Sequence, residues 1–253
     1  MLRPIADEPI AIRQALEEGW RGFRRQAWVL MGFTLLLGSL NLISWLVYRN
    51  SGGLLEGGLP QASAWQLGRA TAALMAYLVS GFWLLVGLIR GADRALDGAP
   101  LTLAELLRFD SRALARLAWS VLVLLVLLAL VQQSGEISAW LLTLLLPRLA
   151  QLPIWAAWAG VIYVLADQVL LLPITVLGRQ SGLAAFRSGR RATDPHWLQA
   201  MGLLLVVLLM LLGGFLLLLA MVAALPWALC TLTAAYRQLF VLPVAATEPS
   251  GPS

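Results

Sequence analysis

The chain has 253 residues, of which 60% are hydrophobic and 12% are charged, and its net charge is +5. Soluble domains carry roughly 25% charged residues, so this composition excludes an ordinary water-soluble domain. All 18 basic residues are arginines, and they flank the apolar segments, where membrane topology explains them without a nucleic-acid partner. The composition therefore predicts an integral membrane protein.

Long uncharged stretches define the predicted fold. No charged residue occurs from Gly202 to Leu232, and a helix needs about 20 residues to cross a hydrocarbon core of about 30 Å. We expect an all-α integral membrane helical bundle of about six transmembrane helices, with amphipathic cytoplasmic surface helices. The predicted spans are residues 27–47, 71–89, 117–131, 154–177, 197–219 and 226–240.

The predicted domain organisation is one six-span transmembrane domain, 27–242, between an amphipathic segment, 1–26, and a disordered tail, 243–253. The first segment lacks the short apolar core and small-residue cleavage site of a signal peptide, so the first span is expected to act as its own insertion signal. An apolar stripe at helical spacing predicts a surface helix here. Its members are Ile12, Leu16, Trp20 and Phe23.

A second surface helix is predicted over 102–116. Thr102 and Glu105 have the spacing of a capping box, which starts a helix. Arginines follow at four-residue spacing along one face of this predicted helix. They are Arg108, Arg112 and Arg116.

The region between the third and fourth spans is the least regular. Residues 132–136 are polar and predict a turn, and 138–152 is apolar but interrupted by Pro147 and Arg148. We interpret 138–152 as a surface or partly inserted segment. The alternative is that it crosses the membrane as a seventh span.

Arginine distribution favours six spans. Segments 1–26, 90–116 and 179–196 together with Arg237 hold fifteen arginines, against three on the opposite side. The positive-inside rule then predicts that both termini are cytoplasmic. A seventh span would move the arginines of 179–196 to the outside.

Each of the three cytoplasmic arginine-rich segments precedes a pair of predicted spans. The spacing of Ala15 and Gly32 equals that of Ala185 and Gly202. Three helical-hairpin repeats are one explanation, and convergence on a common way of starting a membrane helix is the other.

Asp167 is the sharpest candidate for a functional residue. It lies about 18 Å from Arg179 along the predicted fourth span at roughly 1.5 Å per residue, and an intramembrane acid is by default a functional hypothesis. Asn41, Ser80 and Gln168 are expected near the same depth. This candidate intramembrane polar site would bind a proton, a cation or a headgroup, or else Asp167 would only hold neighbouring helices together.

A second candidate site is the cytoplasmic cluster of Arg187, Arg190, Arg191 and His196. Such a cluster attracts anionic lipid headgroups or a protein partner, although topology alone also explains these charges.

Enzyme motifs are missing. The sequence has no P-loop, no metal-binding histidine pair and no nucleophile elbow. We therefore expect no catalytic residue, no cofactor and no metal.

Short motifs resemble uncharacterised bacterial multi-pass membrane proteins similar to the membrane domain of glycerophosphodiester phosphodiesterases. They are residues 184–188, Arg190–Arg191, His196–Trp197, Gly202, Pro226, residues 236–240, Gly19–Trp20 and Trp28. The resemblance implies a helical membrane fold. It implies no phosphodiesterase activity, because no catalytic domain is present, and residues 132–153 depart from the pattern.

These observations favour a non-enzymatic scaffold, assembly or lipid-organising protein of the inner membrane. Its expected partners are the bilayer, anionic lipids, and a membrane protein or a second copy of the chain. The alternative is a small transporter or channel that uses Asp167 in the membrane.

Overall fold

The computed structural model describes residues 10–51, 63–217 and 220–240, and all regular structure within these ranges is helical. This confirms the predicted all-α class. The longer helices, in chain order, are α1 (Ile12–Arg25), α2 (Ala27–Asn50), α3 (Ala64–Leu96), α5 (Ser111–Leu145), α6 (Leu152–Asp167), α8 (Gly182–Thr193), α9 (Trp197–Leu216) and α10 (Met221–Phe240). Short helices are α4 (Leu103–Leu106) and α7 (Leu171–Val176).

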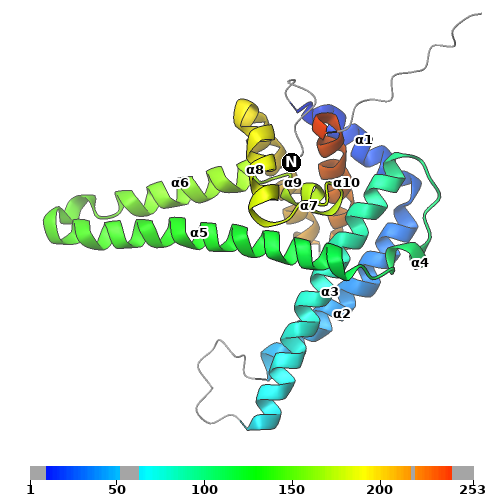
Figure 1. Cartoon of the computed structure of the whole chain (residues 1–253), viewed down its shortest axis with the longest axis horizontal. Helices are drawn as coiled ribbons and strands as arrows, with labels where there is room; N and C mark the ends of the chain where they lie inside the picture. Colours follow the sequence, from blue (N-terminus) through cyan, green and yellow to red (C-terminus); the bar gives the residue numbers. More distant parts are fainter. Residues whose placement is uncertain (1–9, 52–62, 218–219, 241–253) are drawn as a thin grey trace, which may run out of the picture.

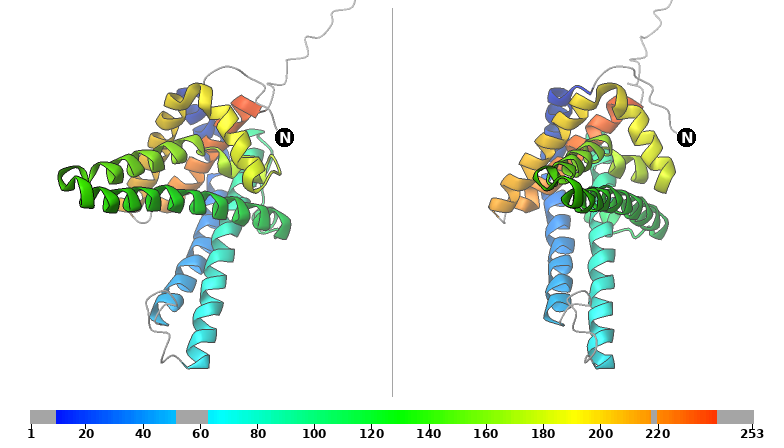
Figure 2. Two further views of the ribbon diagram at one scale, coloured as in Figure 1. Left: turned by 60° about the vertical axis from the view of Figure 1, so that its left-hand side comes forward. Right: turned by 90° about the vertical axis from the view of Figure 1, so that its left-hand side faces the viewer.

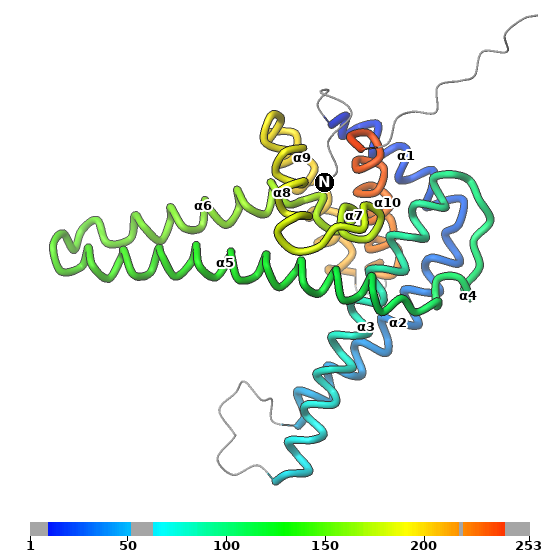
Figure 3. Tube along the Cα trace, in the orientation of Figure 1, coloured from blue at the N-terminus to red at the C-terminus, as the bar shows by residue number. Residues whose placement is uncertain are grey.

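The helices form three hairpins that diverge from one shared hub (Figure 1). In Figure 1 the α2–α3 hairpin runs downward and the α5–α6 hairpin runs to the left, while the rotated views in Figure 2 bring out the direction of α9 and α10. The hub contains α1, α7, α8 and the C-terminal end of α10, as the Cα trace in Figure 3 also shows. The tightest side-chain packing lies here, around fully buried residues such as Phe33, Leu117 and Ile174.

Among the residues that the structure describes, five segments are long and apolar enough to cross a membrane: Ala27–Asn50, Ala64–Leu96, Ser111–Leu145, Pro147–Asp167 and Gly182–Leu216. Helix α10, the predicted sixth span, is not among them, and it begins at Met221, before the predicted start at Pro226. Most of its side chains are buried by other helices. An enclosed helix has less need of apolar side chains, because protein rather than lipid surrounds it.

Helix α1 forms as predicted, but its buried face differs from the predicted stripe. The buried residues are Ala15, Gly19, Gly22 and Phe23, whereas Trp20 is largely exposed. Small residues face α10 because the two helices approach closely. A Cβ atom on Gly19 would lie 2.7 Å from the backbone nitrogen of Thr231. Helix α1 is therefore packed into the hub as well as amphipathic.

The predicted surface helix over 102–116 is wrong. The capping box forms, with Thr102 and Glu105 each accepting from the other's backbone N–H, but α4 ends after four residues. Asp110 then caps a new helix by accepting from the backbone N–H of Ala113 at 3.0 Å. The chain breaks because a second capping residue follows the first at close range, so Arg108 leaves the face that it was expected to share with Arg112.

The predicted turn at 132–136 is also wrong, because α5 continues without a break to Leu145. Ser134 and Ser138 donate to backbone carbonyls of their own helix, which satisfies them inside it. Gly135 allows α6 to approach, since a Cβ atom there would lie 2.4 Å from the Cβ of Ala157. The reversal comes instead at a 3-10 turn, Pro147–Leu149, so 138–152 is not a separate seventh span.

The predicted fourth span, 154–177, is two helices rather than one. Helix α6 ends at Asp167, and α7 begins at Leu171. Pro173 explains the break, since its ring excludes a continuous helix through the preceding turn. Asp167 therefore lies at the hub end of α6. The prediction that it lies deep in the middle of a membrane span is wrong.

Some predicted segments lie wholly or partly outside the described residues. They are residues 1–9 of segment 1–26, residues 218–219 of the predicted fifth span, and the whole tail 243–253. Within the described part, the hairpins follow the shorter helices α1, α4 and α8, although α4 has only four residues, and the repeat hypothesis stays a prediction.

A single arginine joins the last helix to the first hairpin. Arg237 of α10 donates from Nε to Asp93 Oδ1 at 2.8 Å and from Nη1 to Asp97 Oδ1 at 2.6 Å. Its Nη2 also donates to the backbone carbonyl of Asp93 at 2.7 Å. Both aspartates lie at the C-terminal end of α3, so this contact ties two hairpins together at the hub.

Gly19→Ala is expected to lower the free energy of unfolding by about 1–3 kcal/mol, the usual cost of overpacking, because the added methyl would meet the backbone of α10. Thermal unfolding in detergent measures the effect. The control is Gly32→Ala in α2, where a Cβ atom meets nothing within 4 Å. Equal stability of the two variants would contradict the close packing of α1 on α10.

Candidate functional site

Asp167 lies in a compact polar network between α6 and α8. The Thr193 hydroxyl is 2.8 Å from Asp167 Oδ1, and Gln168 Nε2 donates to Asp167 Oδ2 at 2.7 Å. Gln168 Nε2 also donates to the carbonyl of Phe186 at 3.2 Å. Asp167, Gln168 and Thr193 are all buried. Both carboxylate oxygens therefore already have donors from the protein.

The packing around this network leaves little free space. A Cβ atom on Gly189 would lie 2.9 Å from Gln168 Oε1. The Thr193 hydroxyl also lies within 3.0 Å of the carbonyls of Asp167 and Gly189, although it has one hydrogen to donate. The network thus locks the end of α6 against α8, which is the arrangement that a structural role for Asp167 requires.

The structure does not bring the four predicted intramembrane residues together. Asn41 Nδ2 donates to Ser80 Oγ at 3.1 Å and to the carbonyl of Tyr77 at 2.7 Å, which joins α2 to α3. That pair belongs to a different hairpin from Asp167 and Gln168, and the two hairpins diverge (Figure 1). The predicted cluster is two separate helix-to-helix contacts.

The predicted arginine cluster lies on and just after α8. Arg190 pairs with Asp194 at 3.2 Å, and Asp194 also accepts from the Tyr163 hydroxyl at 3.1 Å. Arg187, Arg190 and Arg191 are all exposed and His196 is half-buried, but Arg190 is partly used by its ion pair within the protein. Of these, Arg187 has the side chain best placed to meet an external group.

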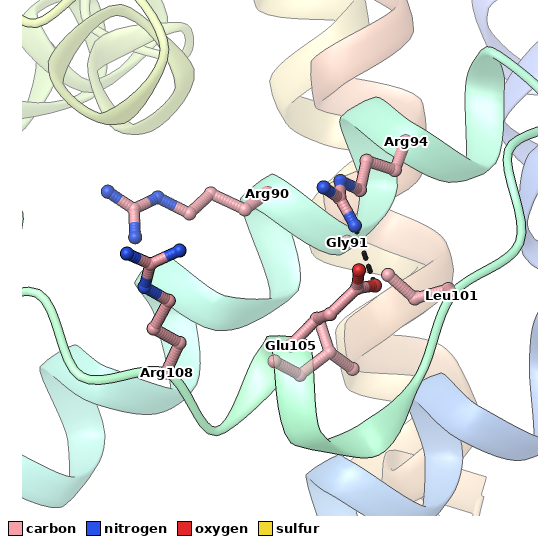
Figure 4. Close-up of a pocket in the computed structure, with 7 residues that line it drawn as sticks. Arg90, Gly91, Arg94, Leu101, Glu105 and Arg108 are labelled. Atoms are coloured by element: carbon pink, nitrogen blue, oxygen red, sulfur yellow. Dashed lines mark ion pairs between the residues drawn. The ribbon is translucent and has the colours of Figure 1, made fainter.

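A second arginine cluster, which sequence reasoning missed, forms where α3 meets the segment from α4 to the start of α5. Arg90 of α3 pairs with Asp110, and Arg94, one turn later, pairs with Glu105 at 2.6 Å. Arg108 comes to lie beside Arg90 because the chain breaks after α4 (Figure 4). The sequence did contain a signal for the helix break that forms this cluster. Asp110 directly precedes Ser111, and an aspartate at such a position is typical of a helix cap.

The Arg90 guanidinium and the backbone N–H of Ala113 stabilise the charged form of the Asp110 carboxyl. Together they lower its pKa from 3.8 to about 2. Asp110 thus serves two helices at once, as the cap of α5 and as an ion-pair partner for α3. The Asp110 carboxyl therefore stays ionised at neutral pH.

Comparison with protein-family models, curated proteins and solved structures finds no match to this chain. The function is therefore argued from its own residues.

Asp167→Ala and Thr193→Val are each expected to lower the free energy of unfolding by about 1–3 kcal/mol, because each leaves a buried partner unsatisfied. The double variant should lose less than the sum, since both changes remove one contact. Denaturant unfolding of the four proteins measures this coupling. Asn41→Ala serves as the control and should add independently to Asp167→Ala, and coupling between those two would contradict the separation of the clusters.

The low pKa of Asp110 predicts a pH-dependent contribution to stability. Because the folded-state pKa is depressed, the contribution is present above about pH 4 and is lost as the pH falls toward about 2. Asp110→Asn keeps a helix-capping side chain but removes the charge. The stability difference between the wild type and Asp110→Asn should shrink over this range in unfolding experiments. A difference that stays constant would argue against the ion pair.

Proposed function

We propose that the chain is a non-enzymatic, multi-pass protein of a bacterial inner membrane with a scaffold, assembly or lipid-organising role, and that both termini face the cytoplasm. The observation that carries this proposal is the divergence of three hairpins from one hub (Figures 1 and 2), because the hairpins are largely apolar and arginines lie at the edge of the hub. In the most apolar 18-residue stretch of α5, only 17% of the residues are buried inside the protein. So much uncovered apolar surface fits a protein that acts by contacting lipid and other membrane helices.

Charge placement supports the orientation. Arg90, Arg94 and Arg237 lie at the hub ends of α3 and α10, and α8 contributes three more arginines to the hub. The positive-inside rule assigns such an edge to the cytoplasm. The same edge offers charges to anionic lipids of the inner leaflet.

The alternative, a small transporter or channel that uses Asp167, has less support. A transport residue needs access to a solute, and the oxygens of Asp167 are bonded to Thr193 and Gln168 instead. The resemblance to the membrane domain of glycerophosphodiester phosphodiesterases adds a relationship to be tested, but no activity.

Extraction from native membranes in lipid particles, followed by mass spectrometry, tests the proposal. We expect a stoichiometric protein partner or a selected anionic lipid. Arg187→Gln should reduce the amount of the co-purified partner or lipid several-fold, because that arginine is exposed on α8. Arg148→Gln, at the tip of the second hairpin, removes the same charge and should have no effect.

Two outcomes would contradict the proposal. One is a protein that carries only bulk membrane lipid and no partner. The other is a solute flux in reconstituted vesicles that Asp167→Asn abolishes while the protein stays folded, which would establish the transporter instead.

A further inference from the structure

We infer that Arg90, Arg108 and Arg112 form a binding site for a phosphate group, presented by a lipid headgroup or by a soluble phosphate. This inference deepens the proposed lipid-organising role and rests on it for the choice of lipid as the leading source. The site lies at the junction of the first two hairpins, away from the α8 cluster.

Local chain geometry creates the site. Helix α4 stops at Leu106 and α5 starts at Ser111, so the intervening residues turn back toward α3. Figure 4 shows the guanidinium groups of Arg90 and Arg108 directed toward one another across this turn. Two cations facing each other repel, and an anion between them would relieve that repulsion.

The charges do not cancel. Arg90, Arg94, Arg108 and Arg112 face only two carboxylates, Glu105 and Asp110, so the site has two excess positive charges. Both carboxylates are already taken, by Arg94 and Arg90 respectively. Among the described residues, neither Arg108 nor Arg112 has an ion-pair partner. Two arginines are thus left with unused donors at the same place.

There is room for a ligand beside these donors. One cavity of about 220 Å³ is lined by Arg90, Arg94 and Arg108, and a second of about 400 Å³ by Arg90, Arg108 and Arg112. A water molecule takes roughly 30 Å³ in the liquid, so either cavity holds a group much larger than one water. Arg90 and Arg108 line both cavities, so a ligand in either one would lie beside both guanidinium groups.

Chemistry selects the class of ligand. A guanidinium group offers a planar fork of N–H donors that matches the oxygens of phosphate in pairs, and it never loses its charge. Several forks around one open space suit a tetrahedral anion with several oxygens. A monovalent carboxylate would leave part of the excess charge unmatched.

The surroundings favour a phosphate that carries acyl chains. Phe109 lines the larger cavity, is 53% exposed, and packs edge-on against Trp83 of α3 at 5.3 Å between ring centroids. Aromatic side chains concentrate at the membrane interface, at headgroup depth. The arginines lie at the ends of two membrane-spanning segments, α3 and α5, which is where a headgroup sits.

The test uses the purified full chain in detergent and three probes: phosphatidic acid, inorganic phosphate and diacylglycerol. Native mass spectrometry and the shift in melting temperature measure binding. We expect phosphatidic acid to bind and stabilise, and diacylglycerol, which lacks phosphate, to do neither. Binding of inorganic phosphate at the same arginines would also support the site and would make a soluble phosphate its source.

Arg108→Gln and Arg112→Gln should each weaken binding of phosphatidic acid about tenfold, the effect of losing one charge-assisted contact. Neither change leaves a carboxylate unpaired, so both variants should fold. Arg108→Lys keeps the charge but loses the planar fork of donors. Its affinity for phosphatidic acid should lie between that of the wild type and that of Arg108→Gln. Arg148→Gln is the control with equal loss of charge.

Equal binding of phosphatidic acid and diacylglycerol would overturn the inference, and so would equal affinities of Arg108→Gln, Arg112→Gln and Arg148→Gln. Its failure is separable from that of the proposed function. The native-membrane experiment depends on Arg187 and reports partners and lipids taken from the cell, whereas this one depends on Arg108 and Arg112 and uses defined probes.

Discussion

The hub depends on the guanidinium group of Arg237. It bonds Asp93 and Asp97 at the end of α3, and these residues are more than one hundred positions away in the sequence. The side chain is only 24% exposed, so water competes weakly for its donors. Because α1 also packs on α10, this contact and the close approach at Gly19 hold α1 and α10 against the first hairpin. The hairpins extend outward from this region of the hub.

Much of the fold follows from apolar length and capping signals. Long uncharged runs predicted the helical membrane class, and the capping box at Thr102 formed as its spacing required. Helix ends were harder, because polar residues inside a long helix look like a turn in sequence. Gly135 and its serine neighbours stay helical since α6 packs on the glycine and the hydroxyls bond to their own backbone. Neither compensation can be seen without the partner helix.

The candidate sites were less predictable for a related reason. Depth along a predicted span placed Asp167, Asn41 and Ser80 together, but depth says nothing about which hairpins touch. Helical periodicity put Arg108 on the face of Arg112, and the Asp110 cap removed it from that face. In the first case the contacts between hairpins were missing from the sequence argument, and in the second a helical periodicity was applied across a break in the helix.

The divergence of the hairpins has a consequence for what counts as the folded protein. In the most apolar stretches of the segments Pro147–Asp167 and Gly182–Leu216, only 17% and 22% of the residues are buried, so most of these helix surfaces have no protein neighbour within the described residues. Acyl chains must then fill the wedges between the arms, much as ordered water completes the packing of a soluble protein. Bilayer thickness and lateral pressure thereby become determinants of the angle between the arms. We expect that detergent in place of those chains would change the angle between the arms and leave the contacts of the hub intact.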